Sequence, residues 1–122
     1  MSKYLKDRLK SFVYAFEGII HLFKSTPNAR IHLAAAIIAI AMGFCLKIST
    51  SEWFAITIVI GAVISLEAIN SAIEEVADLI TKEQNRKIKT IKDLAAGAVL
   101  IMAIAALCVG FIIFIPKIIS LF

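Results

Sequence analysis

Four polar side chains recur on one face of a segment that is otherwise strongly apolar. Glu67, Asn70, Glu74 and Asp78 follow one another at intervals of three, four and four residues within 53–80. In an α-helix of about 3.6 residues per turn, these intervals place all four side chains on the same face. Placing a carboxylate in an apolar environment costs free energy unless a partner or a ligand compensates its charge. The pattern therefore indicates a site for chemistry.

The acids divide by their depth in this segment. Glu67 lies near its middle and is the candidate general base. Glu74 and Asp78 lie closer to a polar, basic stretch, where they can stay ionised and hold a divalent cation. The alternative is that these carboxylates form salt bridges with Lys or Arg of other helices. Glu75 lies off this face, and we expect it to be solvated or paired.

The composition predicts an all-α membrane protein. Of 122 residues, 61% are hydrophobic and 18% are charged, whereas soluble domains have about 45–50% apolar and about 25% charged residues. We expect spans at about 31–48, 53–80 and 94–116, since about 20 apolar residues cross the hydrocarbon core. The length of the chain predicts a single domain, residues 1–122. The charged N-terminal segment does not resemble a cleavable signal peptide.

Residues 2–24 predict an amphipathic surface helix. Large apolar side chains recur there at helical spacing, with Lys and Asp mostly on the other side. A helix of this kind beside membrane spans is expected to lie in the interface plane. The alternative is a cytosolic helix that packs on a partner. A break at 25–28 separates this helix from the first span.

The basic residues gather on one side of the predicted membrane topology. Six of the 13 Lys and Arg precede the first span, and five lie in 81–92 between the second and third spans. The positive-inside rule makes this side cytoplasmic, so we expect a multi-pass membrane protein with its site facing the cytoplasm. The placement argues against nucleic acid as a partner.

Lys92 and Asp93 stand at the cytoplasmic mouth of the third span. Lys92 can neutralise phosphate as a point charge, and Asp93 can cap the helix that follows it. We expect 81–90 to be a polar loop, and Ser51 with Glu52 to start the second span. No glycine-rich phosphate loop is present, so a nucleotide would be held through metal and side chains. His32 is expected to position or pair with another residue.

Three stretches resemble the small prokaryotic integral-membrane diacylglycerol kinases and their undecaprenol kinase relatives. Residues 67–78 match the signature E-x-x-N-[ST]-[SA]-[IV]-E-x-x-x-D. Asn-Ala-Arg-Ile-His at 28–32 and Lys-Asp-Leu-Ala-Ala-Gly-Ala-Val-Leu at 92–100 match further family stretches. The resemblance covers essentially the whole chain, including its surface helix and three spans.

The resemblance implies ATP-dependent phosphorylation of a lipid hydroxyl by a magnesium-requiring homotrimer, with sites shared between neighbouring chains. It implies that Glu67 is the catalytic acid or base, that Asn70 lies near the reacting groups, and that Glu74 is a ligand of metal and ATP phosphate. Lys92, Asp93 and Tyr14 would contact the nucleotide. We expect Arg30, together with Glu67, to bind the lipid.

Two positions depart from the family pattern. The family usually has a metal-binding Glu two residues before the Asn-x-Arg motif, and Thr26 occupies that position here, where its hydroxyl could replace the carboxylate weakly. The family often has Glu-Tyr-His in the second loop, and this chain has Glu83, Gln84 and Asn85. Glu83 is retained, and all three remain candidate nucleotide-binding residues.

The resulting prediction is a kinase that converts diacylglycerol to phosphatidic acid. The alternative acceptor is undecaprenol, which the Asn-x-Arg-Ile-His pattern favours. A proton-coupled exporter would also use an intramembrane Glu, although exporters of this length usually have four spans. An inert assembly subunit is a third possibility, but it would leave the line of acids without a purpose.

Overall fold

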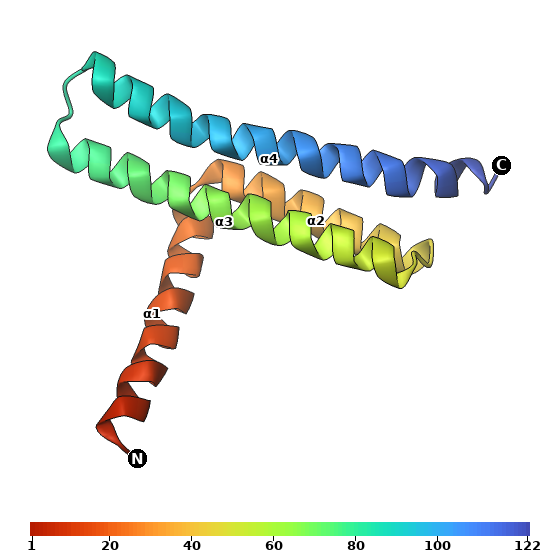
Figure 1. The fold of residues 1–122 in the computed structure, drawn as a ribbon, viewed down its shortest axis with the longest axis horizontal. Helices are drawn as coiled ribbons and strands as arrows, with labels where there is room; N and C mark the ends of the chain where they lie inside the picture. Colours follow the sequence, from red (N-terminus) through yellow and green to blue (C-terminus); the bar gives the residue numbers. More distant parts are fainter.

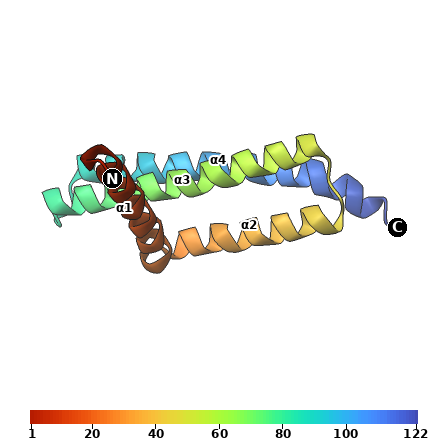
Figure 2. The same cartoon turned by 90° about the horizontal axis from the view of Figure 1, so that it is seen from below.

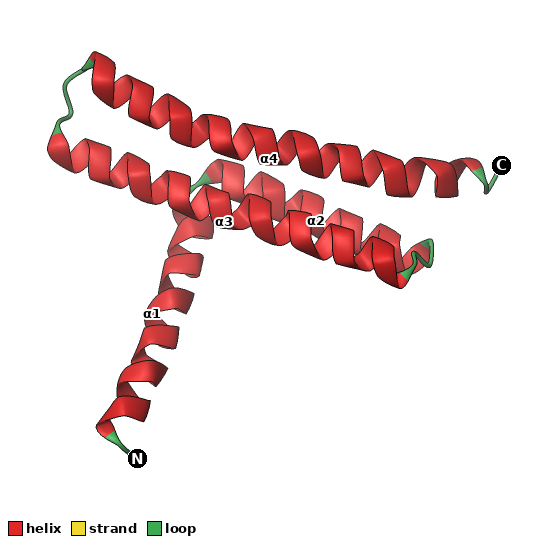
Figure 3. Cartoon of the chain, in the orientation of Figure 1, coloured by secondary structure: helices red, strands yellow, loops and turns green.

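The computed structural model describes residues 1–122 as four helices without a strand (Figures 1 and 3). The helices are α1 (Lys3–Ser25), α2 (Pro27–Cys45), α3 (Thr50–Ile80) and α4 (Arg86–Ile119). The last three are long and apolar enough to cross a membrane. The predicted all-α architecture, with three spanning helices after a first amphipathic one, is confirmed.

The two longest helices, α3 and α4, run antiparallel and side by side, and α2 lies along α3 (Figures 1 and 2). Helix α1 leaves this bundle at a steep angle from an elbow at Thr26. The elbow is tied to α3 because the Thr26 and Ser71 hydroxyl oxygens lie 3.1 Å apart. Nine residues of α3 follow Ser71, so the α3–α4 end extends about 14 Å beyond the elbow.

Local capping interactions fix where the helices begin. Ser2 accepts a hydrogen bond from the backbone N–H of Leu5 at the start of α1. Pro27 is the first residue of α2, a position where its missing N–H costs nothing. Ser49 and Glu52 form a reciprocal capping box at the start of α3. The prediction that Ser51 starts this helix is therefore wrong by two residues.

The start of α4 differs more from its prediction. The Asn85 side chain accepts hydrogen bonds from the backbone N–H groups of Lys87 and Ile88, 2.8 and 3.4 Å away. The helix therefore begins at Arg86, and the connection is 81–85 instead of the predicted loop 81–90. Asp93 lies inside the helix and does not cap it, so that prediction is wrong.

A small apolar core closes the end of the bundle opposite the 81–85 connection. Ile48, Ile56, Ile113 and Phe114 are buried together there. Trp53 packs against Phe44 in a tilted arrangement with 4.8 Å between ring centroids, and it also covers Gly43. Lys117 of α4 forms an ion pair with Glu52 of α3, with 3.2 Å between Nζ and Oε1. This end holds α2, α3 and α4 in register, which fixes the positions of the polar side chains farther along.

Candidate functional site

Glu67 is the most deeply buried ionisable side chain, with 2% of its surface exposed. It faces α2, where Nε2 of His32 lies 3.5 Å from Glu67 Oε1. The second carboxylate oxygen, Oε2, is buried and has no hydrogen-bond partner. The prediction that His32 pairs with another residue is confirmed.

Asn70 lies about one turn along α3 from Glu67 and is 8% exposed. Its Nδ2 donates to Glu74 Oε1 at 3.5 Å, and its Oδ1 is buried without a partner. Leaving a buried acceptor unpaired costs roughly 1–3 kcal/mol, and such atoms are rare in native proteins. Two unpaired acceptors, Glu67 Oε2 and Asn70 Oδ1, therefore lie on neighbouring turns, where a bound hydroxyl could donate to one of them.

Glu74 is exposed near the elbow and is the candidate metal ligand closest to this pair. Thr26, the other candidate, has its hydroxyl engaged with Ser71. A single chain contains no group of three metal-binding side chains. Magnesium in phosphate-transfer sites is held by one or two carboxylates plus phosphate oxygens and water. An exposed Glu74, held by Asn70, fits a magnesium ion that arrives with phosphates.

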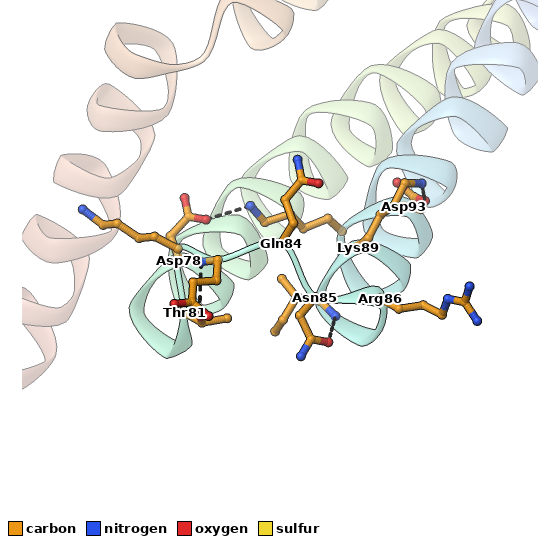
Figure 4. Close-up of a pocket in the computed structure, with 11 residues that line it drawn as sticks. Asp78, Thr81, Gln84, Asn85, Arg86, Lys89 and Asp93 are labelled. Atoms are coloured by element: carbon orange, nitrogen blue, oxygen red, sulfur yellow. Dashed lines mark hydrogen bonds and ion pairs between the residues drawn. The ribbon is translucent and has the colours of Figure 1, made fainter.

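A polar hollow of about 610 Å³ lies at the open end of the bundle (Figure 4). The end of α3, the connection and the start of α4 line it. Its lining residues are Asp78, Thr81, Lys82, Glu83, Gln84, Asn85, Arg86, Ile88, Lys89, Lys92 and Asp93. The hollow thus collects the predicted nucleotide-binding residues of the connection and of α4.

Two ion pairs form among the residues that line the hollow, and Figure 4 draws both as dashed lines. Lys92 Nζ lies 2.7 Å from Asp78 Oδ1 and joins α4 to α3. Lys89 Nζ lies 2.6 Å from Asp93 Oδ2, one turn along α4. The alternative in which the acids form salt bridges is therefore correct for Asp78. Sequence reasoning did not single out Lys89 as a partner, although its i,i+4 spacing to Asp93 is a usable signal.

The candidates Tyr14 and Arg30 also lie away from the hollow in a single chain. Tyr14 is 65% exposed on α1, and no residue of α1 or α2 lines the hollow. Arg30 is exposed at the start of α2 and forms no ion pair. Glu75 is exposed as predicted.

Comparison with known proteins places the chain in a family. A family model described as prokaryotic diacylglycerol kinase matches residues 13–114. The chain belongs to the prokaryotic diacylglycerol kinase family. It is 42% identical over 108 residues to an undecaprenol kinase from Bacillus subtilis, covering 88% of both chains. It is also 35% identical over 114 residues to a diacylglycerol kinase from Synechocystis, covering 93% of this chain and 65% of the relative.

The site of this family member is arranged by depth along α3. Asp78 lies eleven positions after Glu67, which corresponds to about 17 Å along the helix axis. The two buried acceptors, Glu67 Oε2 and Asn70 Oδ1, lie at one end of this stretch of α3, and the polar hollow lies at the other end. Glu74 lies between them. The arrangement suits a lipid kinase, because an acceptor hydroxyl and a charged phosphate donor need different surroundings.

Proposed function

We propose that this chain transfers the γ-phosphate of ATP to the hydroxyl of a membrane lipid alcohol. The observation that carries the proposal is the unpaired, buried Oε2 of Glu67 within the apolar part of α3. A lipid hydroxyl that reached this depth could give its proton to Oε2. Asn70 Oδ1, on the next turn, is a second unpaired acceptor, which could accept from another donor of the bound substrate.

The donor would bind at the cytoplasmic end. The hollow is lined by four basic side chains, Lys82, Arg86, Lys89 and Lys92, and by three acidic ones, Asp78, Glu83 and Asp93, which leaves a net charge of +1. This excess of positive charge favours a polyphosphate. Glu74 would hold magnesium together with the phosphates, with Thr26 as the weaker second candidate. The metal, when bound, neutralises phosphate charge, and the protein's part is to position the two reactants in line.

Undecaprenol is the acceptor that we propose, with diacylglycerol as the alternative. The relative named undecaprenol kinase has the higher identity of the two and is covered to 88% of its length. The Asn-x-Arg-Ile-His pattern at 28–32 favours the same acceptor. This choice reverses the order in which the sequence alone ranks the two lipids.

We further propose a homotrimer in the bacterial inner membrane, with the hollow facing the cytoplasm. The basic residues before α2 and around the connection support this orientation. One feature supports a site shared between chains, since Tyr14 lies on α1, which does not line the hollow of its own chain.

A phosphate-transfer assay tests the proposed function. The purified protein in lipid vesicles would receive Mg-ATP labelled at the γ-phosphate, with undecaprenol in one sample and diacylglycerol in another. We expect label in the lipid fraction, and more of it with undecaprenol. Label in neither lipid would refute the kinase proposal. Proton-driven substrate flux without ATP consumption would favour the exporter instead.

A further inference from the structure

His32 lies in a line of small residues on the face of α2 that contacts α3. Ala29 and Ala36 are buried, at 0% and 7% exposed, and Gly43 lies two turns farther along the same face. Small side chains let two helices approach closely. His32, three residues after Ala29 and four before Ala36, is the polar side chain in this line. Its imidazole therefore projects toward the interior of the α2–α3 pair.

Only one of the two carboxylate oxygens of Glu67 contacts His32. Nε2 lies 3.5 Å from Oε1, whereas Oε2 has no partner. The His32 side chain is 25% exposed and the Glu67 side chain 3%. An alanine or a leucine at position 32 would continue the apolar face without the cost of desolvating an imidazole. The placement of a histidine here is thus explained by the carboxylate that it faces.

We propose that His32 is a positioning residue for phosphate transfer. It holds Oε1 and directs Oε2 toward the acceptor hydroxyl. This inference rests on the proposed function, in which Glu67 is the base. In the transfer step the lipid O–H proton moves to Oε2, the lipid oxygen forms a bond to the γ-phosphorus, and the bond from that phosphorus to the β–γ bridging oxygen breaks. His32 takes up no proton and acts by orienting the carboxylate.

This role requires a donor at Nε2 of His32. The neutral imidazole supplies one when its proton is on Nε2. A separation of 3.5 Å is long for a hydrogen bond, and catalytic hydrogen bonds commonly tighten once substrate is bound. The role therefore depends on an N–H donor at position 32 and not on the imidazole ring itself. A glutamine, whose side-chain amide N–H can donate from a similar position, should replace His32 for the most part.

The first test compares His32→Ala, His32→Gln and a control, His21→Gln, in the full chain reconstituted with lipid. His21 is an exposed histidine on α1. We expect His32→Ala to lower kcat by about 10- to 100-fold, since a small misplacement of a catalytic group can cost about 100-fold. The KM for ATP should not change. His32→Gln should recover most of the loss, and His21→Gln should match the parent.

Wild-type kcat in His32→Ala would overturn the proposal, and so would a His32→Gln variant that is no better than His32→Ala. Thermal unfolding of each variant gives the folded fraction, and kcat is calculated for that fraction, because a loss of folded protein lowers the apparent kcat and leaves the KM for ATP unchanged.

A second test separates this inference from the proposed function. Glu67→Asp withdraws the carboxylate from His32, so adding His32→Ala to Glu67→Asp should lower kcat little further. Losses that multiply in the double variant would overturn the positioning role. Absence of phosphate transfer in the parent would refute the proposed function itself, whereas a Glu67→Asp variant as active as the parent would refute the role of Glu67 as base and with it the positioning role. If Glu67→Asp were impaired while His32→Ala was not, only the positioning role would fail.

Discussion

The carboxylates of α3 differ in what surrounds them. Glu67 is buried with one oxygen unpaired, Glu74 is exposed and contacts Asn70, and Asp78 is bound to Lys92. The helical period alone predicts that these residues share a face. It does not predict the pairing of Asp78 with Lys92 or of Glu67 with His32, because those contacts depend on the register between different helices.

Glu74 can be tested through the magnesium requirement. Replacing it with Gln removes a negative charge that would hold the metal, so the magnesium concentration for half-maximal activity should rise about tenfold or more. Glu75→Gln is the matched control, because Glu75 is the adjacent acid and is also exposed. Equal magnesium curves for the two variants would contradict a metal-binding role for Glu74.

Lys92 can be tested through the affinity for ATP. Lys92→Gln removes a charge from the hollow, and the loss of one charge-assisted contact should raise the KM for ATP about tenfold. Lys117→Gln is the matched control, since Lys117 also forms an ion pair between α4 and α3 but lies at the opposite end. A rise in KM that is equally large in Lys117→Gln would indicate damage to the bundle instead of lost nucleotide contact.

At the scale of elements, the predicted helices are present but several begin elsewhere. Arg86, Lys87 and Lys89 are good helix formers, yet their charge makes this stretch resemble a loop in sequence. Asn85 decides the boundary by capping α4, which also gives this candidate nucleotide-binding residue a structural role. A cap becomes evident only when the helix that it starts is known, so the sequence does not place this boundary.

The packing of α2 on the start of α3 can be tested at Gly43. A Cβ added there would lie 2.7 Å from the Trp53 ring, so Gly43→Ala should lower the free energy of unfolding by about 1–3 kcal/mol. Gly61→Ala is the control, since a Cβ at Gly61 meets nothing within 4 Å. Unfolding in detergent, followed by circular dichroism, measures both. An unchanged midpoint for Gly43→Ala would contradict the close contact.

At the scale of the whole molecule, the elbow at Thr26 determines the height of the site relative to α1. If α1 lies in the interface plane, Glu67 lies about one turn below it and the hollow lies beyond it in water. The charge pattern predicts the orientation of the chain. It does not predict that the α3–α4 end projects past α1, because that depends on where Thr26 meets Ser71.

The orientation can be tested by labelling single cysteines in intact cells after Cys45 and Cys108 are replaced by Ser. Gln84→Cys, in the connection, should resist a membrane-impermeant thiol reagent until the cells are opened. Thr50→Cys, at the opposite end, should react from outside. The reverse pattern would place the hollow on the outer side and contradict the proposed use of cytoplasmic ATP.

The central claim is that the buried carboxylate of Glu67 takes the proton from a lipid hydroxyl. Its most direct test is the rate of phosphate transfer to lipid by Glu67→Gln, measured beside Glu75→Gln. Loss of a general base should lower kcat by at least about 100-fold, while Glu75→Gln keeps the parental rate. A Glu67→Gln variant that phosphorylates lipid as fast as the parent would contradict the account.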